Sequence, residues 1–350
     1  REQTSNVEIF FRDILPDTIM IRKLVDLSEC GIETNRADVL TSRADLLSNR
    51  ILPVKFMNST VGSPSTLELR VLLGSMNLND FVWLEKAKGR THLDVDEVRH
   101  LVRLLVQEGR ELQSKGEYQS QFNMSSVFTT TQGLRFVNPL ASREYIKETA
   151  KYHPSYNKDF YNDVFAKEIF ISRVRRNVRQ SGIIALYSAL LRHDDKAMGE
   201  RGQLNEEEVS TVLDQFRGTY PEVLYHQVAN LVCLNIDQNN VPLFSTLLVT
   251  PTGETSYFKP TGEELRRNFS SKIHSPGGFF YTIHDRRTIN PPPVDSIKNS
   301  LAVNNTAQPT INHRTISVQP RDEQEFGALE QNGRGSRFNP NAKNPGNQQL

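Results

Sequence analysis

Hydrophobic residues recur at helical spacing through most of the first 290 residues. The clearest case starts at Asp94 and Glu97, which match a capping box, and continues as an apolar stripe with steps of three and four residues. The stripe consists of Val98, Leu101, Val102 and Leu105. The same spacing, with its start and stop residues, predicts further helices over residues 17–31, 37–51, 142–191, 205–218 and 221–235. The last two are joined by a short connection, which predicts an antiparallel pair.

Three segments have the alternation or the turn residues of β-strands. Residues 66–73 alternate and end at Gly74, and hairpins are predicted over residues 121–138 and 243–258. Strands and helices do not alternate regularly, as they would in a nucleotide-binding sheet. The predicted fold class is therefore α+β, a predominantly α-helical body with a few β-hairpins and a long extended C-terminal tail.

The end of the chain differs in kind from the rest. From Asn290 onward it is rich in proline, asparagine, glutamine and glycine, with too little apolar surface to offset its ordering entropy alone. We expect such a segment to be ordered only against another surface, above all a neighbouring subunit. The predicted organisation is a helix-rich subdomain with a hairpin over 1–140, a helical subdomain with a hairpin over 141–289, and an extended polar arm over 290–350.

Charge and cysteine content limit the classes of protein. The formal net charge of +1, from 42 Lys and Arg against 41 Asp and Glu, gives no overall attraction to nucleic acid or to an anionic membrane. No run approaches eighteen apolar residues, so we predict no membrane span. Cys30 and Cys233 lie in apolar helical patterns, which is typical of reduced core cysteines. The predicted location is cytoplasmic or, for a capsid protein, the virion.

The strong catalytic motifs are absent from the sequence. It has no phosphate-binding Gly-Lys loop, no Gly-x-Ser-x-Gly elbow and no His-Glu-x-x-His. The acidic clusters at Asp94 and Asp237 lack the glycine turn and the ligand spacing of a calcium loop. His284 lies beside Asp285, but no nucleophile is identifiable near it. We therefore predict no catalytic residue, no metal, no cofactor and no enzymatic activity.

The segment Lys167–Arg179 has the most suggestive charge pattern. On a helical projection, Phe170, Ile171, Val174 and Val178 gather on one side, whereas most arginines gather on the other. The predicted site for nucleic acid or an acidic partner consists of Arg173, Arg175, Arg176, Arg179, Arg266, Arg267, Arg286 and Arg287. The alternative is a solvated helix face paired with nearby acids.

Five aromatic residues precede this basic segment. They are Tyr152, Tyr156, Phe160, Tyr161 and Phe165. Such residues can stack on bases, but we favour a role in packing two helices and a loop into a core.

The first hypothesis for function is a non-enzymatic structural or assembly protein that forms a multi-subunit particle. A viral capsid or nucleocapsid subunit fits this hypothesis best, because it combines a compact body, polar arms and a local RNA-facing patch. Its subunits would form a homo-oligomer through the C-terminal arm, with nucleic acid as a further partner and no membrane. The alternatives are a cytosolic adaptor that recruits partners through its tail, and an enzyme of a family that its motifs do not identify.

Overall fold

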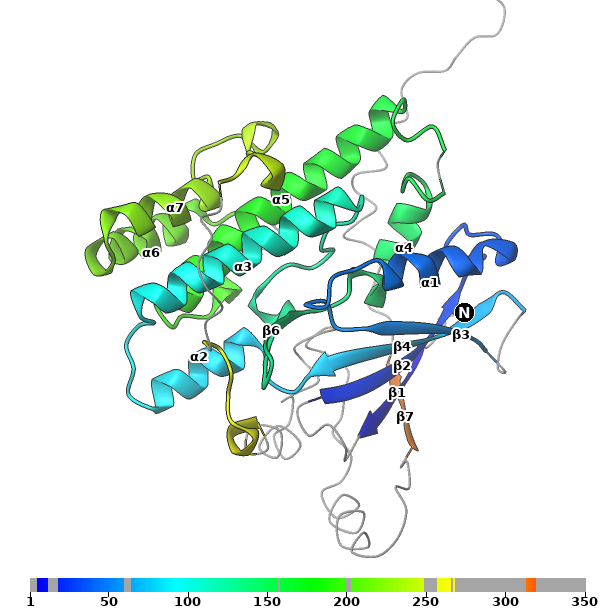
Figure 1. Ribbon diagram of the computed structural model, residues 1–350, viewed down its shortest axis with the longest axis horizontal. Helices are drawn as coiled ribbons and strands as arrows, with labels where there is room; N and C mark the ends of the chain where they lie inside the picture. Colours follow the sequence, from blue (N-terminus) through cyan, green and yellow to red (C-terminus); the bar gives the residue numbers. More distant parts are fainter. Residues whose placement is uncertain are drawn as a thin grey trace, which may run out of the picture.

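The computed structural model describes residues 5–11, 18–59, 64–156, 158–198, 203–248, 257–265, 267 and 313–318, the backbone alone for 5–11, 18–19 and 313–318. The described elements form two parts (Figure 1). A sheet with helix α1 lies on one side, and most of the helices lie on the other, with the β5–β6 hairpin between them. The fold class predicted from sequence, a helix-rich α+β protein, is confirmed.

The sheet has five strands, and all of its pairs are antiparallel. Their order is β3-β4-β2-β1-β7. The strands are β1 (Ser5–Phe11), β2 (Thr18–Asp26), β3 (Val54–Asn58), β4 (Thr66–Gly74) and β7 (His313–Val318). Because β4 has neighbours on both sides and is covered by other elements, seven of its nine residues are buried.

Strand β2 occupies the segment that the sequence pattern predicted as a helix over residues 17–31, and that prediction is wrong. Met20 and Leu24 are four residues apart, a spacing that places side chains together on a helix and also on one face of a strand. Pairing decides between the two: Ile21 lies opposite Ile9 of β1 and Val71 of β4. These partners are distant in sequence, so local periodicity does not report them.

Helices begin at the predicted signals at Asp94, Asn205 and Pro221. The helix predicted over 142–191 is instead two helices, separated by residues 151–163, and the helix over 78–87 was not predicted. The helices in the described residues are α1 (Ala37–Asp45), α2 (Leu78–Ala87), α3 (Val95–Ser114), α4 (Arg143–Ala150), α5 (Val164–Ala189), α6 (Glu206–Thr219) and α7 (Glu222–Val232). The capping box of Asp94 and Glu97 is formed, and the Asn205 side chain caps α6. The hairpin predicted over 121–138 is confirmed as β5 (Val127–Thr130) and β6 (Gly133–Phe136).

Helix α5 connects the two hydrophobic cores of the protein. Its C-terminal half, from Ile183 to Ala189, is buried in the core formed with α3, α6 and α7. Val174 and Val178, nearer its N-terminus, belong instead to the core that includes β2, β4 and α4. The N-terminal turns of α5 extend past the end of α3 (Figure 1). The helix therefore has a buried C-terminal half and an N-terminal end at the periphery.

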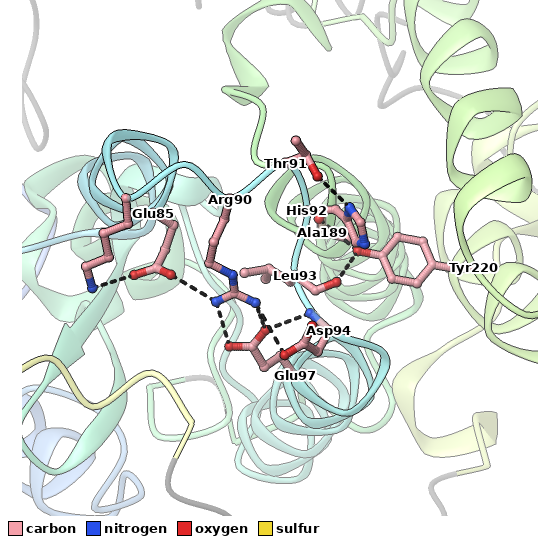
Figure 2. Close-up of polar contacts among 10 residues, drawn as sticks. Glu85, Arg90, Thr91, His92, Leu93, Asp94, Glu97, Ala189 and Tyr220 are labelled. Carbon is pink, nitrogen blue, oxygen red and sulfur yellow. Dashed lines mark hydrogen bonds and ion pairs between the residues drawn. The ribbon is translucent and has the colours of Figure 1, made fainter.

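Arg90 fixes the connection between α2 and α3 (Figure 2). Its guanidinium donates to Glu85 Oε2 at 2.9 Å and to Glu97 Oε2 at 2.5 Å, while the amide of Asp94 donates to the same Glu97 oxygen at 2.7 Å. Nearby, the Tyr220 hydroxyl lies 2.7 Å from the carbonyl oxygen of Leu93. The acidic cluster at Asp94 therefore caps a helix and binds an arginine, as expected of a structural group.

Glu108 anchors α3 to the loop before β3. Both of its oxygens accept from Ser48 Oγ, at 3.1 and 2.9 Å, and Arg50 Nη1 lies 3.7 Å away. Burial raises the pKa of Glu108 from 4.5 to about 7. A carboxyl whose pKa is raised on folding contributes stability that is present below pH 4.5 and is lost as the pH rises through 7.

Glu108→Gln should therefore stabilise the protein at pH 8, by about 2 kcal/mol in the free energy of unfolding, and have little effect near pH 4.5. Urea unfolding at the two pH values measures this difference. Asp214→Asn on the exposed side of α6 is the control and should change stability by less than about 0.5 kcal/mol at either pH. A Glu108→Gln effect that is independent of pH would contradict this assignment.

Two further predictions are affected by the structure. The hairpin predicted over 243–258 is wrong in its first strand, because Phe244–Thr246 form a 3₁₀-helix. Arg110 of α3 donates to the Phe244 carbonyl oxygen, and the Ser245 amide donates to Gln113 Oε1 of α3. Its turn lies outside the described residues.

Of the arm predicted over 290–350, the structure describes only β7, which pairs with β1 of the same chain. The proposed subdomain boundaries and self-association through the arm stay predictions.

Candidate interaction surface

Two arginines of the predicted basic site are occupied within the protein. Arg173 binds Glu148 of α4, with Nε and Nη2 2.8 and 2.7 Å from Oε1. Arg179 Nη2 donates to the carbonyl oxygen of Ile236 at 2.6 Å, and its Nη1 donates to Gln238 Oε1 at 3.0 Å. These side chains connect α5 to α4 and to the segment after α7, so they are structural and only partly available to a ligand.

Arg175 and Arg176 are different, because neither forms a side-chain hydrogen bond or an ion pair within the described residues. Both are half-buried, and Arg175 Nε is buried without a hydrogen-bond acceptor. Burial and the neighbouring charge of Arg173 lower the pKa of Arg176. Two partly desolvated positive charges without a carboxylate partner are the part of the predicted site that stays open to an external ligand.

The other predicted arginines do not extend this site. Arg267 is exposed and binds Glu263 one turn away. The side chain of Arg266 and all of Arg286 and Arg287 lie outside the described residues, as do His274 and His284.

Three large apolar side chains are exposed at the start of α5. Tyr161, Val164 and Phe165 are 71%, 67% and 72% exposed. The prediction that the aromatic residues of this region pack into a core holds for Tyr152 and Phe160, which are buried, and is wrong for Tyr161 and Phe165. Asp163 accepts a hydrogen bond from the Ala166 amide at 3.0 Å and so starts the helix between these exposed residues.

The apolar residues and the open arginines are aligned along the helix. Val164 and Arg175 are three turns apart and differ by only about 20° in direction, and the same holds for Phe165 and Arg176. Exposed Glu168 lies one turn after Val164, on the same side. We call this surface, made of Tyr161, Val164, Phe165, Glu168, Arg175 and Arg176, the α5 face.

Two cavities among the described residues do not resemble a substrate site. One, of about 30 Å³, is lined by serine, asparagine and glutamine residues and by Phe128, Val137 and Ala141, and it has no ionisable lining residue. The other, of about 230 Å³, lies between α2, α3 and residues 257–264. Most of its charges are paired, since Lys88 lies 2.9 Å from Glu85 and 2.6 Å from Glu264, and Arg90 lies 2.5 Å from Glu97.

The described part of the chain has neither a metal-binding cluster nor a membrane-spanning helix. Within the described residues, no group of three histidine, cysteine or acidic side chains is placed to hold a metal ion. None of the helices described combines the length and apolar character that crossing a bilayer requires. The Asp237 side chain accepts from the Asn239 amide at 3.4 Å and so caps a short 3₁₀-turn.

Comparison with known proteins finds likeness only at the level of solved structures. No protein-family model and no curated protein sequence matches the chain. The structure is similar to the PAN3 pseudokinase of Drosophila melanogaster, with 11% identity and a TM-score of 0.45 over 81% of this chain and 63% of that one. It is also similar to a mutant PAN3 pseudokinase of Neurospora crassa, with 11% identity and a TM-score of 0.42 over 72% of this chain and 54% of that one. The chain thus spans less than two thirds of either protein.

These comparisons contradict the prediction of a viral capsid or nucleocapsid subunit. The matching structures are pseudokinases and not virion proteins, so the prediction of a particle-forming, RNA-binding structural protein is wrong. The likeness is too distant to carry an argument about activity or partners, and such an argument has to come from the surface of this chain.

Proposed function

We propose that this chain is a non-catalytic adaptor that binds a partner protein through the α5 face. The observation that carries the proposal is the cluster of Tyr161, Val164 and Phe165, each about two-thirds exposed or more. Exposed large apolar side chains cost solvation free energy, and contiguous groups of them mark interaction sites. Aromatic residues and arginine, which lie at the two ends of this face, are the residue types most enriched in binding hot spots.

The absence of catalysis is part of the same proposal. A catalytic centre needs a concave site with convergent ionisable groups. The polar cavity has room for a water molecule or two at about 30 Å³ and no ionisable lining residue. The larger cavity holds acids and bases that bind each other, so their charges stabilise the fold.

Site-specific photocrosslinking tests the proposal. A photoreactive phenylalanine analogue at position 165, in the full chain expressed in its own cells, should crosslink to a distinct protein partner. The matched control is the analogue at position 223, where Val223 of α7 is also 67% exposed but lies outside the α5 face. Phe165→Asp should abolish co-purification of that partner, whereas Val223→Asp should retain it.

Crosslinks at position 165 that match those at position 223 would overturn the proposal, and so would crosslinks at 165 to lipid or nucleic acid alone. Thermal unfolding of both aspartate variants should remain within about 1 kcal/mol of the wild-type protein, because the substituted side chains are on the surface.

A further inference from the structure

We infer that the ligand of the α5 face is an amphipathic helix of the partner, with apolar residues at one end and carboxylates about three turns away. This inference rests on the proposed function and specifies the chemistry of the partner. The distance follows from the helix rise, because the eleven residue steps from Val164 to Arg175 span about 16 Å. A partner helix lying along α5 therefore meets both ends of the face within roughly three of its own turns.

The apolar end supplies the contact area. Tyr161, Val164 and Phe165 come from the first turn of α5 and the residues just before it, at the end of the helix that extends past α3 (Figure 1). Leucine, methionine or aromatic side chains of a partner helix, spaced three and four residues apart, cover such a surface.

The basic end determines the charge of the partner. Arg175 and Arg176 form no ion pair within the described residues, although Glu148, which binds Arg173, also attracts Arg176. Their partial burial weakens their contact with water. Guanidinium groups bind carboxylates through charge-assisted hydrogen bonds, which strengthen as water is excluded. Glutamate or aspartate opposite these two arginines therefore completes the face.

Glu168 favours a protein helix with charges of both signs over a uniform polyanion as the ligand of the α5 face. It is exposed between the apolar and basic ends, and exposed Asp159 precedes the helix. These carboxylates offset the charges of the neighbouring Lys158 and Lys167, so this part of the face does not attract a phosphate backbone or an anionic lipid surface. A partner helix, in contrast, can place lysine opposite Glu168. The complementary order is therefore apolar, then basic, then acidic along the partner.

Two designed helical peptides of identical composition test this order. The first has leucines in its first turn, lysine in its second and glutamates in its fourth, and the second peptide exchanges the lysine and glutamate positions. A free peptide can dock in either direction, so the assay tests the order and not the polarity. In fluorescence anisotropy with the full chain, the first peptide should bind at least about tenfold more tightly, which corresponds to about 1.4 kcal/mol.

Charge reversal supplies the second arm. Arg175→Glu with Arg176→Glu should remove the preference for the first peptide or invert it. Arg217→Glu on α6, an exposed arginine outside the α5 face, should leave the preference unchanged. Added salt should weaken the preference, because it screens exposed charges.

Equal binding of the two peptides, or no binding of either, would overturn the inference. Binding to phosphatidylserine vesicles that is lost in the Arg175 and Arg176 variant would assign the face to membranes instead. If the charge variants have no effect on the partner crosslinked at position 165, the adaptor function stands and this partner chemistry fails. If position 165 crosslinks no partner, the adaptor function itself fails.

Discussion

Gly182→Ala should lower the free energy of unfolding by roughly 3 kcal/mol or more, because α5 and α7 meet backbone to backbone at this position. A Cβ atom added at Gly182 would lie 2.3 Å from the amide nitrogen of Val232 and 2.6 Å from the carbonyl carbon of Leu231. These are main-chain atoms, which no change of rotamer can move. The helices would have to separate, and α5 takes part in both hydrophobic cores. Urea unfolding followed by circular dichroism measures the loss.

Gly218→Ala in α6 is the matched control. No atom lies within 4 Å of a Cβ added at Gly218, so alanine brings only its better helix propensity. We expect a gain of about 0.5–1 kcal/mol there. Gly182→Ala has the same propensity gain, so the difference between the two variants isolates the close contact. Equal stability of the two variants would mean that α5 and α7 do not approach as closely as described.

Helices with local start and stop signals could be predicted from sequence. The cap at Asn205 and the proline at Pro221 bracket α6 and α7, and both act within four residues of the groups that they satisfy. Such signals do not depend on the rest of the fold. For the same reason, the boundaries of α3 follow from Asp94 and Glu97.

The five-stranded sheet could not be predicted in this way, because its order depends on pairs distant in sequence. Strand β2 is flanked by β4, about forty residues later, and by β1, whose other neighbour β7 lies near the end of the chain. Among the strands of this sheet, only β4 was predicted from its own sequence, through the alternation over residues 66–73 and the following Gly74. The segment predicted as an arm thus contributes a strand to the chain's own sheet.

The basic site could be predicted only in part. Sequence places four arginines on one helix, but it does not tell which of them are occupied by other elements. Arg173 donates a hydrogen bond to Glu148, twenty-five residues earlier, and Arg179 donates to a backbone carbonyl oxygen after α7. The exposure of Tyr161 and Phe165 likewise depends on which side of α5 packs against the core that includes β2, β4 and α4. The feature that does follow from spacing is the three-turn alignment of Val164 with Arg175.

A buried ion pair joins α1 to the helical part and has no counterpart in any sequence motif. Arg43 Nε and Nη2 donate to Glu117 Oε1 and Oε2 at 2.7 and 2.9 Å, and both side chains are only 2% exposed. The Tyr145 hydroxyl also donates to Glu117, and His153 Nε2 lies 3.1 Å from it. Burial raises the pKa of Glu117, but the charge and hydrogen bonds of Arg43 and His153 outweigh it and hold the pKa well below its ordinary value.

Removing one member of this pair leaves a buried charge without its partner. Arg43→Met and Glu117→Leu should therefore each lower the free energy of unfolding by about 3–5 kcal/mol at pH 7. The double variant Arg43→Met with Glu117→Leu removes both charges and should be more stable than either single variant, because a buried pair replaced by apolar groups costs far less than a broken one. Urea unfolding measures the free energy of unfolding of the three variants. Each variant can be made in a chain that also has Gly218→Ala, which adds stability. Additive losses would show that the two side chains act independently.

The wild-type protein and the double variant should differ in how much stability they lose at acid pH. Because folding lowers the pKa of Glu117, the wild-type protein has the full stabilisation of the pair above about pH 4.5 and loses it as the pH falls through the folded-state value. Burial also lowers the pKa of His153, so neutral His153 favours the folded state above about pH 6.5, and that contribution is lost on acidification. The double variant lacks the Glu117 carboxylate and should lose less stability than the wild-type protein between pH 7 and pH 3. Parallel losses would mean that other groups, and not this pair, govern the acid unfolding of the protein.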